Sequence, residues 1–322
     1  MRSILHAIIA ALLLLGAVPA AAQSNYPERN IRLLFGFPPG ADSDERLLAD
    51  KLAEAFGKAV IVENVTGAGG NIAADRIAKA RPDGYTIGLL ANTNIVVNVS
   101  LYGKLSYDPV KDLAPITQFF GFPNVLVINN EVPAKSVKEL VELARAQPGK
   151  LTFGHSGPGT PTHLSGELVK SMARIDLQQV SYRGPPQILT DLIGGQITMS
   201  FVAPGPALPL IREGKIRALA VTSLKRAPFA LSIPTMDESG FPGFDVTSWV
   251  GLFAPAGTPA SIIEKLNRET TRIVALPEIR QKLYDLGHIP LGNTPAEFAE
   301  VIKVETPYWA RIIKDAGIKP IE

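Results

Sequence analysis

The sequence predicts an α/β protein made of two lobes. Short runs of aliphatic residues alternate with segments whose apolar residues recur at helical spacing. This alternation begins at residues 31–35 and starts again after Pro123. The connections are short, which is typical of a mostly parallel sheet covered by helices. Because no long flexible linker separates the halves, we expect two lobes joined by strands that cross near residues 119–127 and 246–253.

The first half contains three expected strands and two expected helices. The strands are at residues 31–35, 60–62 and 85–90, and the helices are at residues 44–56 and 72–80. In the first helix, Leu48, Leu52 and Phe56 fall on one face, which is typical of an amphipathic helix packed on a sheet. Pro82-Asp83-Gly84 ends the second helix, because proline and glycine favour turns.

The second half repeats this pattern. Strands are expected at residues 125–128, 151–153, around Val180, 197–201, 216–221 and 249–254, and helices at residues 137–146, 161–172, 185–193, 259–275, 278–286 and 295–316. Residues 228–243 are rich in proline and glycine and are expected to be irregular. We expect the last three helices to return to the first lobe, which would comprise residues 23–123 and 247–322. Residues 124–246 would form the second lobe.

The charge balance argues against a nucleic-acid partner. The chain has 32 basic and 30 acidic residues among 322, so its formal net charge is only +2. A chain so balanced has no strong field to attract a polyanion. It also lacks dense runs of Lys and Arg interleaved with aromatic residues. We therefore expect no nucleic-acid binding.

The first 22 residues have the pattern of a cleaved export signal. Arg2 provides the positive end, residues 8–18 the apolar core, and Ala20-Ala21-Ala22 the small residues before a mature start at Gln23. The apolar core is shorter than the roughly 20 residues that span a bilayer, so we expect a soluble mature chain. The chain has no cysteine, which removes disulfides, thiol nucleophiles and a lipid-bearing cysteine. Export without disulfides favours a bacterial periplasm.

Three glycine-rich loops lead into helices, at residues 37–44, 66–71 and 154–161. A helix N-terminus has free N–H groups and a partial positive charge, and glycine lets a ligand approach the backbone, so these loops suit an anion. In the third loop, Thr160 is the expected N-cap and the hydroxyl of Ser156 would add a donor. The alternative interpretation is that such loops are only tight turns with helix caps.

Asp44 places a negative charge beside the first of these loops. Its structural interpretation is stabilisation of the first turn of its helix by an acidic side chain. Its functional interpretation is acceptance of hydrogen bonds from a ligand hydroxyl, amine or bridging water. We favour the structural interpretation.

The sequence offers little support for an enzyme. Residues 154–158 miss the Gly-x-Ser-x-Gly hydrolase elbow, because Pro158 stands at the last position. His163 and Glu167 could be nominated as partners of Ser156, but a triad needs spatial geometry. No metal-binding motif, dinucleotide fingerprint or P-loop is present, so we expect no metal and no cofactor.

A series of short segments, in order along the whole mature chain, carries a family resemblance. They are Tyr26-Pro27, Ile31-Arg32-Leu33, Phe37-Pro38-Pro39-Gly40 with Asp44, Val62-Glu63-Asn64, Gly67-Ala68-Gly69-Gly70-Asn71, Pro82-Asp83-Gly84-Tyr85-Thr86, Ser156-Gly157, Gly159-Thr160, His163-Leu164, Gly166-Glu167-Leu168, Gly194-Gly195-Gln196, Arg217-Ala218-Leu219-Ala220 and Gly251-Leu252-Phe253-Ala254-Pro255. The chain resembles the substrate-binding proteins of tripartite tricarboxylate transporters, the Bug receptors.

The resemblance implies a type II periplasmic binding protein fold, or Venus flytrap, with a ligand cleft between two α/β lobes. It implies a carboxylate held by backbone and hydroxyl donors and by bridging waters. The expected ligand-binding residues are Phe37, Pro39, Gly40, Ala41, Asp44, Asn92, Ser156, Gly157, Gly159, Thr160, His163 and Ala203. The chain departs from the family pattern at Ala41, where glycine is usual, and at His155, where a small residue is more usual. Phe119, Phe120 and Phe122 would either line an apolar wall of the cleft or belong to the core.

The expected function is therefore capture of a small organic carboxylate and its delivery to a membrane transporter. The resemblance names a large and a small integral-membrane subunit as partners, and we expect a monomeric receptor that is not an enzyme. One alternative is a ligand-sensing receptor for a signalling partner, and another is an exported serine hydrolase that uses Ser156. Dicarboxylates, tricarboxylates, amino acids and aromatic acids all remain open, and Arg183 could reach the cleft from a distant part of the sequence.

Overall fold

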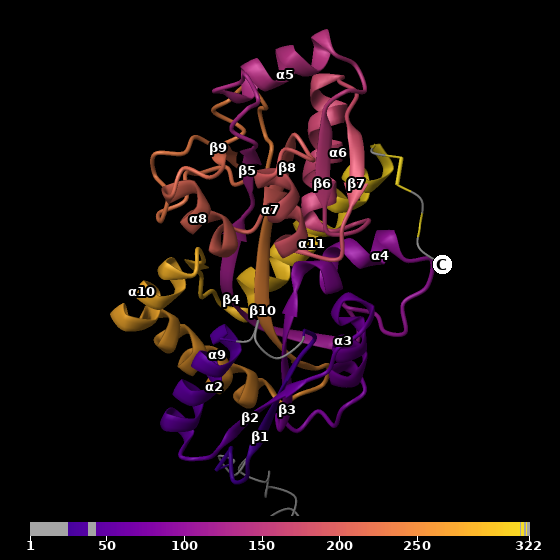
Figure 1. Cartoon of the computed structure of the whole chain (residues 1–322). Coiled ribbons are helices and arrows are strands. Elements are labelled where there is room, and N and C mark those ends of the chain that lie inside the picture. The colour runs from indigo at the N-terminus through magenta and orange to yellow at the C-terminus, as the bar shows by residue number, and fades with distance from the viewer. Residues whose placement is uncertain (1–24, 38–42, 316, 319, 321–322) are drawn as a thin grey trace, which may run out of the picture.

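The computed structural model describes residues 25–37, 43–315, 317–318 and 320, and it shows two α/β lobes stacked end to end (Figure 1). The predicted α/β class with two lobes is confirmed. The expected export signal at residues 1–22 lies outside the described residues, as do Pro39, Gly40 and Ala41.

The first lobe is built on a six-stranded sheet with the order β11-β4-β10-β3-β1-β2. Its strands are β1 (Ile31–Phe35), β2 (Val60–Asn64), β3 (Thr86–Ala91), β4 (Leu113–Pro123), β10 (Thr247–Pro255) and β11 (Ile289–Pro290). Its helices are α2 (Ser43–Phe56), α3 (Asn71–Ala78), α9 (Ala260–Ala275) and α10 (Pro277–Asp285), with short turns η1 (Ala68–Gly70), η2 (Thr93–Val97) and α4 (Asn98–Leu101). Strand β1 is parallel to β2 and β3, whereas β10 is antiparallel to β3 and β4.

The second lobe is built on a five-stranded sheet with the order β7-β6-β8-β5-β9. Its strands are β5 (Val125–Ile128), β6 (Thr152–His155), β7 (Gln178–Ser181), β8 (Met199–Val202) and β9 (Arg217–Val221), and its helices are α5 (Val137–Ala146), α6 (Pro161–Ala173), α7 (Pro185–Ile193) and α8 (Pro204–Arg212). Strand β6 is parallel to β7 and β8, and β5 is antiparallel to β8 and β9. Both sheets are therefore mixed, and the expectation of mostly parallel sheets is wrong.

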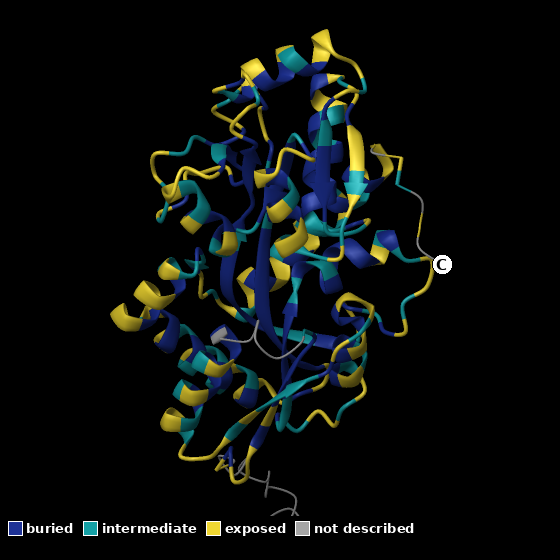
Figure 2. Cartoon of the chain, in the orientation of Figure 1, coloured by how far each residue is buried: buried dark blue, intermediate teal, exposed yellow. Residues whose placement is uncertain are grey.

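The strands form the core and the helices shield it. Figure 2 shows buried strands at the centre of each lobe and helices whose outward faces are exposed. In α5, for example, Val137, Leu140, Val141 and Ala144 are buried on one face. Its N-cap Ser136 accepts a hydrogen bond from the backbone N–H of Glu139, which satisfies an orphan donor of the first turn. Local capping and apolar spacing thus agree with the observed element.

Two backbone crossings join the lobes, and one threonine ties them together. Only Asn124 separates β4 from β5, and residues 222–246 return to β10. The buried hydroxyl of Thr222 accepts from the backbone N–H of Asn124 at 2.8 Å and donates to the carbonyl of Val246 at 2.8 Å. Because both crossings share this hydroxyl, the two lobes meet at a fixed point.

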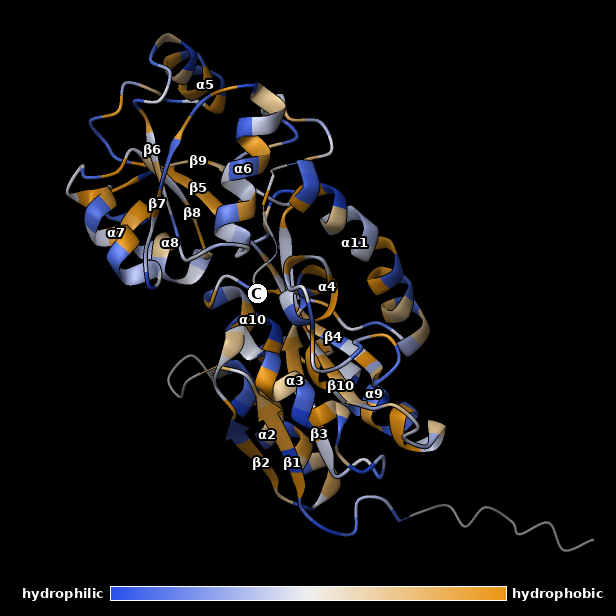
Figure 3. Cartoon of the chain, turned by 90° about the vertical axis from the view of Figure 1, so that its right-hand side faces the viewer, coloured by the Kyte–Doolittle hydropathy of each residue, from blue (hydrophilic) through white to orange (hydrophobic). Residues whose placement is uncertain are grey.

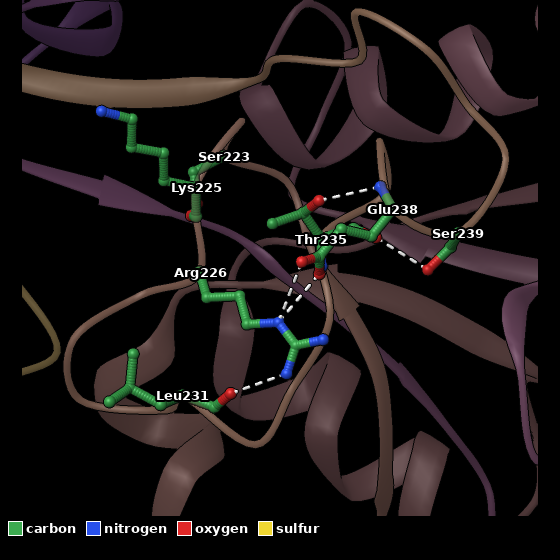
Figure 4. Close-up of polar contacts among 7 residues, drawn as sticks. All are labelled: Ser223, Lys225, Arg226, Leu231, Thr235, Glu238 and Ser239. Atoms are coloured by element: carbon green, nitrogen blue, oxygen red, sulfur yellow. Dashed lines mark hydrogen bonds and ion pairs between the residues drawn. The ribbon is translucent and has the colours of Figure 1, made fainter.

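The returning segment is irregular, as predicted, but it is held by its own polar contacts (Figure 4). The guanidinium of Arg226 donates to both carboxylate oxygens of Glu238 at 3.1 and 2.9 Å, and to the carbonyl of Leu231 at 3.0 Å. The N–H of Glu238 in turn donates to the hydroxyl of Thr235 at 3.0 Å. The segment is thereby ordered without regular secondary structure.

The C-terminal helix α11 (Pro295–Asp315) runs along one side of the molecule past both lobes (Figure 3). It contacts β4 and α4 of the first lobe and α6 of the second lobe. Its buried residues Phe298 and Trp309 join a hydrophobic cluster that contains residues of both lobes. Gly251 on β10 makes this docking possible, since a Cβ there would lie 2.3 Å from Cζ of Phe298.

Most expected elements are present with small shifts of their ends, but three regions were not predicted. The N-terminal part of β4, before the crossing expected near residues 119–127, the turns at η2 and α4, and the helix α8 are absent from the expectations. Helix α8 contains prolines at positions 204, 206 and 209, which sequence rules exclude from a helix interior. The first of these lies in the first turn, where a missing N–H costs nothing.

We predict that Gly251→Ala destabilises the protein by about 1–3 kcal/mol, because the added methyl group displaces Phe298 and loosens α11. Urea unfolding followed by circular dichroism measures this change. Gly103→Ala is the matched control, because no described atom lies within 4 Å of the added Cβ. Equal stability of the two variants would show that α11 does not pack closely on β10.

Candidate functional site

A cavity of about 280 Å³ lies between the two lobes. Residues from both lobes line it: Phe37, Gly69, Ala91, Asn92, Thr93, Asn98, Leu101, Tyr102, Phe122, Pro158, Gly159, Thr160, Pro161, Ser248 and Trp249. They come from the ends of β1, β3 and β4, the turns η1, η2 and α4, the start of β10, and the loop before α6. None of the described lining residues carries a charge. The cavity thus joins chain segments that are far apart in sequence.

On the first lobe, a buried network of amides positions the cavity wall. The side-chain oxygen of Asn71 accepts hydrogen bonds from Asn94 at 3.0 Å, from Asn98 at 2.7 Å and from the hydroxyl of Tyr107 at 3.1 Å. The amide of Asn94 also donates to the carbonyl of Gly69 at 2.9 Å. Burial raises the pKa of Tyr107, so its hydroxyl stays protonated and donates. The glycine loop and the turns η2 and α4 are therefore fixed to one another.

On the second lobe, the loop before α6 has the expected cap. The backbone N–H of His163 donates to the hydroxyl of N-cap Thr160, although at 3.4 Å, and Pro161 occupies the first helical position. Gly157 and Gly159 have φ of 108° and 74°, which only glycine adopts readily. A Cβ at Gly159 would lie 2.0 Å from Cδ2 of Leu101. The side chain of Leu101 on the first lobe therefore packs directly against the backbone of the second lobe.

Two buried histidines hold this loop. Nδ1 of His155 accepts from the N–H of Gly157, and Nδ1 of His163 accepts from the N–H of Gly159, both at 3.1 Å. Nε2 of His163 lies 3.1 Å from Oε1 of Gln179 and donates to it. These partners assign a neutral ring with the proton on Nε2 of His163, since Nδ1 must be free to accept. Burial lowers the pKa of both histidines, which favours the neutral form.

The sequence predicted free backbone N–H groups in this loop, but several of them already donate hydrogen bonds within the protein. The N–H groups of Gly157 and Gly159 go to the histidines, and the N–H of Ser156 donates to the hydroxyl of Thr162 at 3.0 Å. The N–H of Thr160 donates to the carbonyl of Gly157. The expectation of several free backbone donors here is therefore corrected, because side chains and a carbonyl already accept them.

Side-chain groups around the cavity remain available. Oγ of Ser156, Oδ1 of Asn92 and Oγ of Ser248 are buried and have no hydrogen-bond partner among the described residues. Asn92 and Ser248 line the cavity, and Ser156 precedes its lining loop. Buried polar atoms are nearly always paired in folded proteins, so the two unpartnered ones that line this cavity, with a third just before its lining loop, indicate groups available to a ligand.

Asp44 lies in the first turn of α2 and faces a histidine. Its Oδ2 is 3.1 Å from Nδ1 of His288, without the alignment of a hydrogen bond, and its Oδ1 has no partner among the described residues. The His288 ring stacks on Phe120 with centroids 4.2 Å apart and lies 5.4 Å from Phe122. Asp44 does not line the cavity, although Phe122 does.

The structure brings together some of the expected site residues. Phe37, Asn92, Gly159 and Thr160 line the cavity, whereas Asp44, Ser156, Gly157, His163 and Ala203 lie outside its lining. Ala203 is the N-cap of α8. Phe119 and Phe120 belong to the core of the first lobe, and Arg183 is exposed and absent from the lining. Sequence reasoning missed Leu101, Tyr102, Ser248 and Trp249, which no motif marks.

The serine-hydrolase alternative fails on geometry. Both ring nitrogens of His163 are engaged by Gly159 and Gln179 rather than by Ser156. The carboxylate of Glu167 accepts from Lys170 at 2.8 and 3.1 Å. The nominated serine, histidine and acid therefore do not form a triad, which would require each group to hydrogen-bond to the next.

A larger cavity of about 620 Å³ lies between α11 and the segment before β10. Acidic residues Asp245, Glu297, Glu300 and Glu305 line it together with apolar side chains. Burial raises the pKa of Glu305 to about 7 and also raises the pKa of Asp245. This lining would repel an anion, and the glycine loops lie elsewhere, so we take the smaller cavity between the lobes as the candidate site.

Across the described part of the chain, no helix combines the length and the apolar character that a bilayer span requires.

Comparison with known proteins gives a consistent match. The model of the tripartite tricarboxylate transporter family receptor matches residues 45–318. Protein BugT of Bordetella pertussis is 32% identical over 306 residues, which cover 94% of this chain and 94% of that protein. Rpa4515 of R. palustris, solved with adipate, has a TM-score of 0.82 and 34% identity, covering 92% of this chain and 100% of that one. MatC (Rpa3494) from Rhodopseudomonas palustris, with bound malate, has a TM-score of 0.76 and 31% identity, covering 89% and 100%.

We predict that the histidine pair makes stability depend on pH. A folded-state pKa below the ordinary value of about 6.5 means that the unfolded chain binds protons more readily. The free energy of unfolding is therefore highest above about pH 6.5 and falls as the pH is lowered below that value. Urea unfolding at pH 7.5, 6.5 and 5.5 measures the slope.

The double variant His155→Asn/His163→Asn is the test of this cause. Asparagine places an acceptor oxygen near the position of Nδ1 but does not titrate. We expect the loss of stability between pH 7.5 and 5.5 to be smaller in the double variant than in the original protein. Equal slopes would show that these histidines do not carry the pH dependence.

Proposed function

Because the chain belongs to the tripartite tricarboxylate transporter receptor family and is a solute-binding receptor, we propose that it captures a small organic carboxylate between its lobes. We further propose that it works in the periplasm and delivers the ligand to the integral-membrane subunits of its transporter. The adipate and malate bound to the two R. palustris proteins are both carboxylates, which supports this ligand class.

The observation that carries the proposal is the cavity between the lobes with unpartnered polar groups at its edge. Ser248 and Asn92 line it from the first lobe, and Thr160 lines it from the second, in the loop that follows the unpartnered hydroxyl of Ser156. A ligand bound by groups from both lobes would stabilise their approach, because each lobe alone offers only part of the binding surface. This arrangement suits a receptor that releases its ligand when the lobes separate.

The electrostatics of the cleft support an anion without a basic side chain. The N-terminus of α6, a helix of 13 residues, faces the cavity through Thr160 and Pro161. Its aligned peptide dipoles place a partial positive charge at that end. Hydroxyl donors such as those of Ser156 and Ser248 can then complete the coordination of a carboxylate. Such a site binds an anion and releases it again more readily than a buried ion pair would.

We also propose the lobe boundaries as residues 23–123 and 247–322 for the first lobe and 124–246 for the second. The two crossings tied by Thr222 support this division. Removal of residues 1–22 on export would leave a monomeric receptor that begins at Gln23. Mass spectrometry of the exported protein measures the new N-terminus, and a mature chain that still carries these residues would contradict this part of the proposal.

We predict that one or more organic acids raise the thermal stability of the refolded, ligand-stripped protein. A ligand that binds only the folded state adds about 2.7 kcal/mol at a hundredfold excess over its dissociation constant. Ser156→Ala should weaken the tightest acid about tenfold, because a hydrogen bond to a charged group contributes about 1.5–3 kcal/mol.

Ser171→Ala, at an exposed serine near the end of α6 and outside the cavity lining, is the matched control and should leave affinity unchanged. Isothermal titration calorimetry measures both variants. A panel of mono-, di- and tricarboxylates that produces no thermal shift would refute carboxylate capture.

A further inference from the structure

We propose that the cleft selects an aromatic monocarboxylate, a single ring that carries one carboxylate, over a dicarboxylate. This inference rests on the proposed function and narrows its ligand class. The cavity of about 280 Å³ lies at the lower end of the sizes usual for small-molecule sites, so one small acid fills it.

Aromatic side chains form much of the cavity wall. Phe37, Tyr102, Phe122 and Trp249 all line it. The polar atom of Trp249 is turned away, because its Nε1 donates to Oε2 of Glu305 on α11 at 2.9 Å. The indole itself is buried against Phe298 of α11, with ring centroids 5.0 Å apart, so the half-buried Phe37, Tyr102 and Phe122 present the aromatic surface of the cavity. Aromatic rings pack favourably against one another in offset and edge-to-face arrangements, so this wall suits a ring.

Phe122 is positioned for such a contact. It lies at the end of β4, is only half-buried, and stands 5.4 Å from the ring of His288 and 6.3 Å from that of Phe120. The side chains of Phe119 and Phe120, its neighbours on β4, are buried in the core of the first lobe. Phe122 is thus the member of this aromatic run that remains free to contact a ligand.

Two unpartnered polar side chains lie together beside this wall. Ser248 lies directly opposite Phe122 in the pairing of β10 with β4. The amide nitrogen of Asn92 lies 3.4 Å from the carbonyl of Thr247, the residue before Ser248. Oγ of Ser248 and Oδ1 of Asn92 have no partner among the described residues. The hydroxyl of Ser248 and the second N–H of the Asn92 amide, beside the one that donates to Thr247, match the two oxygens of a single carboxylate.

A second carboxylate would have no comparable partner. No described lining residue is basic, and two of the other polar lining groups are already engaged: the hydroxyl of Thr160 donates to the carbonyl of Gly157 at 2.7 Å, and the amide of Asn98 donates to Oδ1 of Asn71 at 2.7 Å. A buried carboxylate without hydrogen bonds or a counter-charge is strongly disfavoured. The cleft should therefore accept a ligand with one charged end and one apolar end, and should bind a ligand charged at both ends more weakly.

The test is calorimetric titration of the ligand-stripped protein with six acids. Benzoate, 4-hydroxybenzoate and phenylacetate represent the proposed class, and adipate, malate and succinate represent dicarboxylates. We expect the best aromatic acid to bind at least about tenfold more tightly than the best dicarboxylate, a difference of about 1.4 kcal/mol. A dicarboxylate that binds as tightly or more tightly would overturn the proposed selectivity while leaving carboxylate capture intact. Failure of all six acids would overturn the proposed selectivity, and a further failure of the whole panel of mono-, di- and tricarboxylates would refute the proposed function itself.

Phe122→Leu separates the aromatic wall from general folding effects. We expect it to weaken the best aromatic acid about tenfold and to leave the affinity for dicarboxylates within about twofold, since only the ring contact is lost. Phe56→Leu, a half-buried phenylalanine at the far end of α2, is the matched control and should change neither affinity. Equal affinity of Phe122→Leu and the original protein for every aromatic acid would show that the wall does not contact the ligand.

Discussion

The antiparallel pair of β4 and β10 is the constraint on which the rest of the molecule depends. Along its length it forms the middle of the first sheet, and at its far end it supplies both connections to the second lobe. The crossings are tied where Thr222 bonds to Asn124 and Val246. The same pair carries Phe122, Ser248 and Trp249 to the cavity and gives α11 its docking surface at Gly251. Lobe geometry and ligand site are therefore set by one stretch of strand pairing.

The cavity between the lobes and the larger cavity beside α11 differ in the charge of their lining residues. The cavity between the lobes has no charged described residue in its lining, but it meets a helix N-terminus and unpartnered hydroxyl groups. The larger cavity beside α11 has four acidic residues, and burial raises the pKa of Glu305 there to about 7. An anion would bind in the first and avoid the second. His155 and His163 are neutral, so they hold the glycine loop without placing a permanent charge beside the candidate site.

Much of the fold was predictable because local patterns and tertiary packing agree. The strands β1 and β5 and the helix α7 begin and end where the apolar runs and the flanking proline and glycine indicate. The first half of β4 was not predicted, because Pro115 interrupts its pattern and its pairing with β10 keeps it extended, whereas its end lies in the crossing expected near residues 119–127. Helix α8 was not predicted because sequence rules treat proline as a helix breaker, and Pro209 lies inside this helix. Both cases are decided by long-range packing rather than by local preference.

The candidate site was predictable in part for the same reason. Glycine loops at helix starts mark Gly159 and Thr160, but nothing in the sequence places Asn92 beside Ser248, which lies on a strand more than 150 residues away. Nor does the sequence show that the two histidines would take up the backbone donors of Gly157 and Gly159. These features depend on sheet register and on side-chain direction, which only the folded chain defines.

The most direct test of this account is a crystal structure of the protein with its tightest carboxylate. The account predicts the ligand between the lobes, with its carboxylate within hydrogen-bond distance of Ser248 or Asn92, its body against Phe122, and a further contact to the loop at Gly159 and Thr160 of the second lobe. A ligand bound instead in the acidic cavity beside α11, or contacting one lobe only, would contradict it.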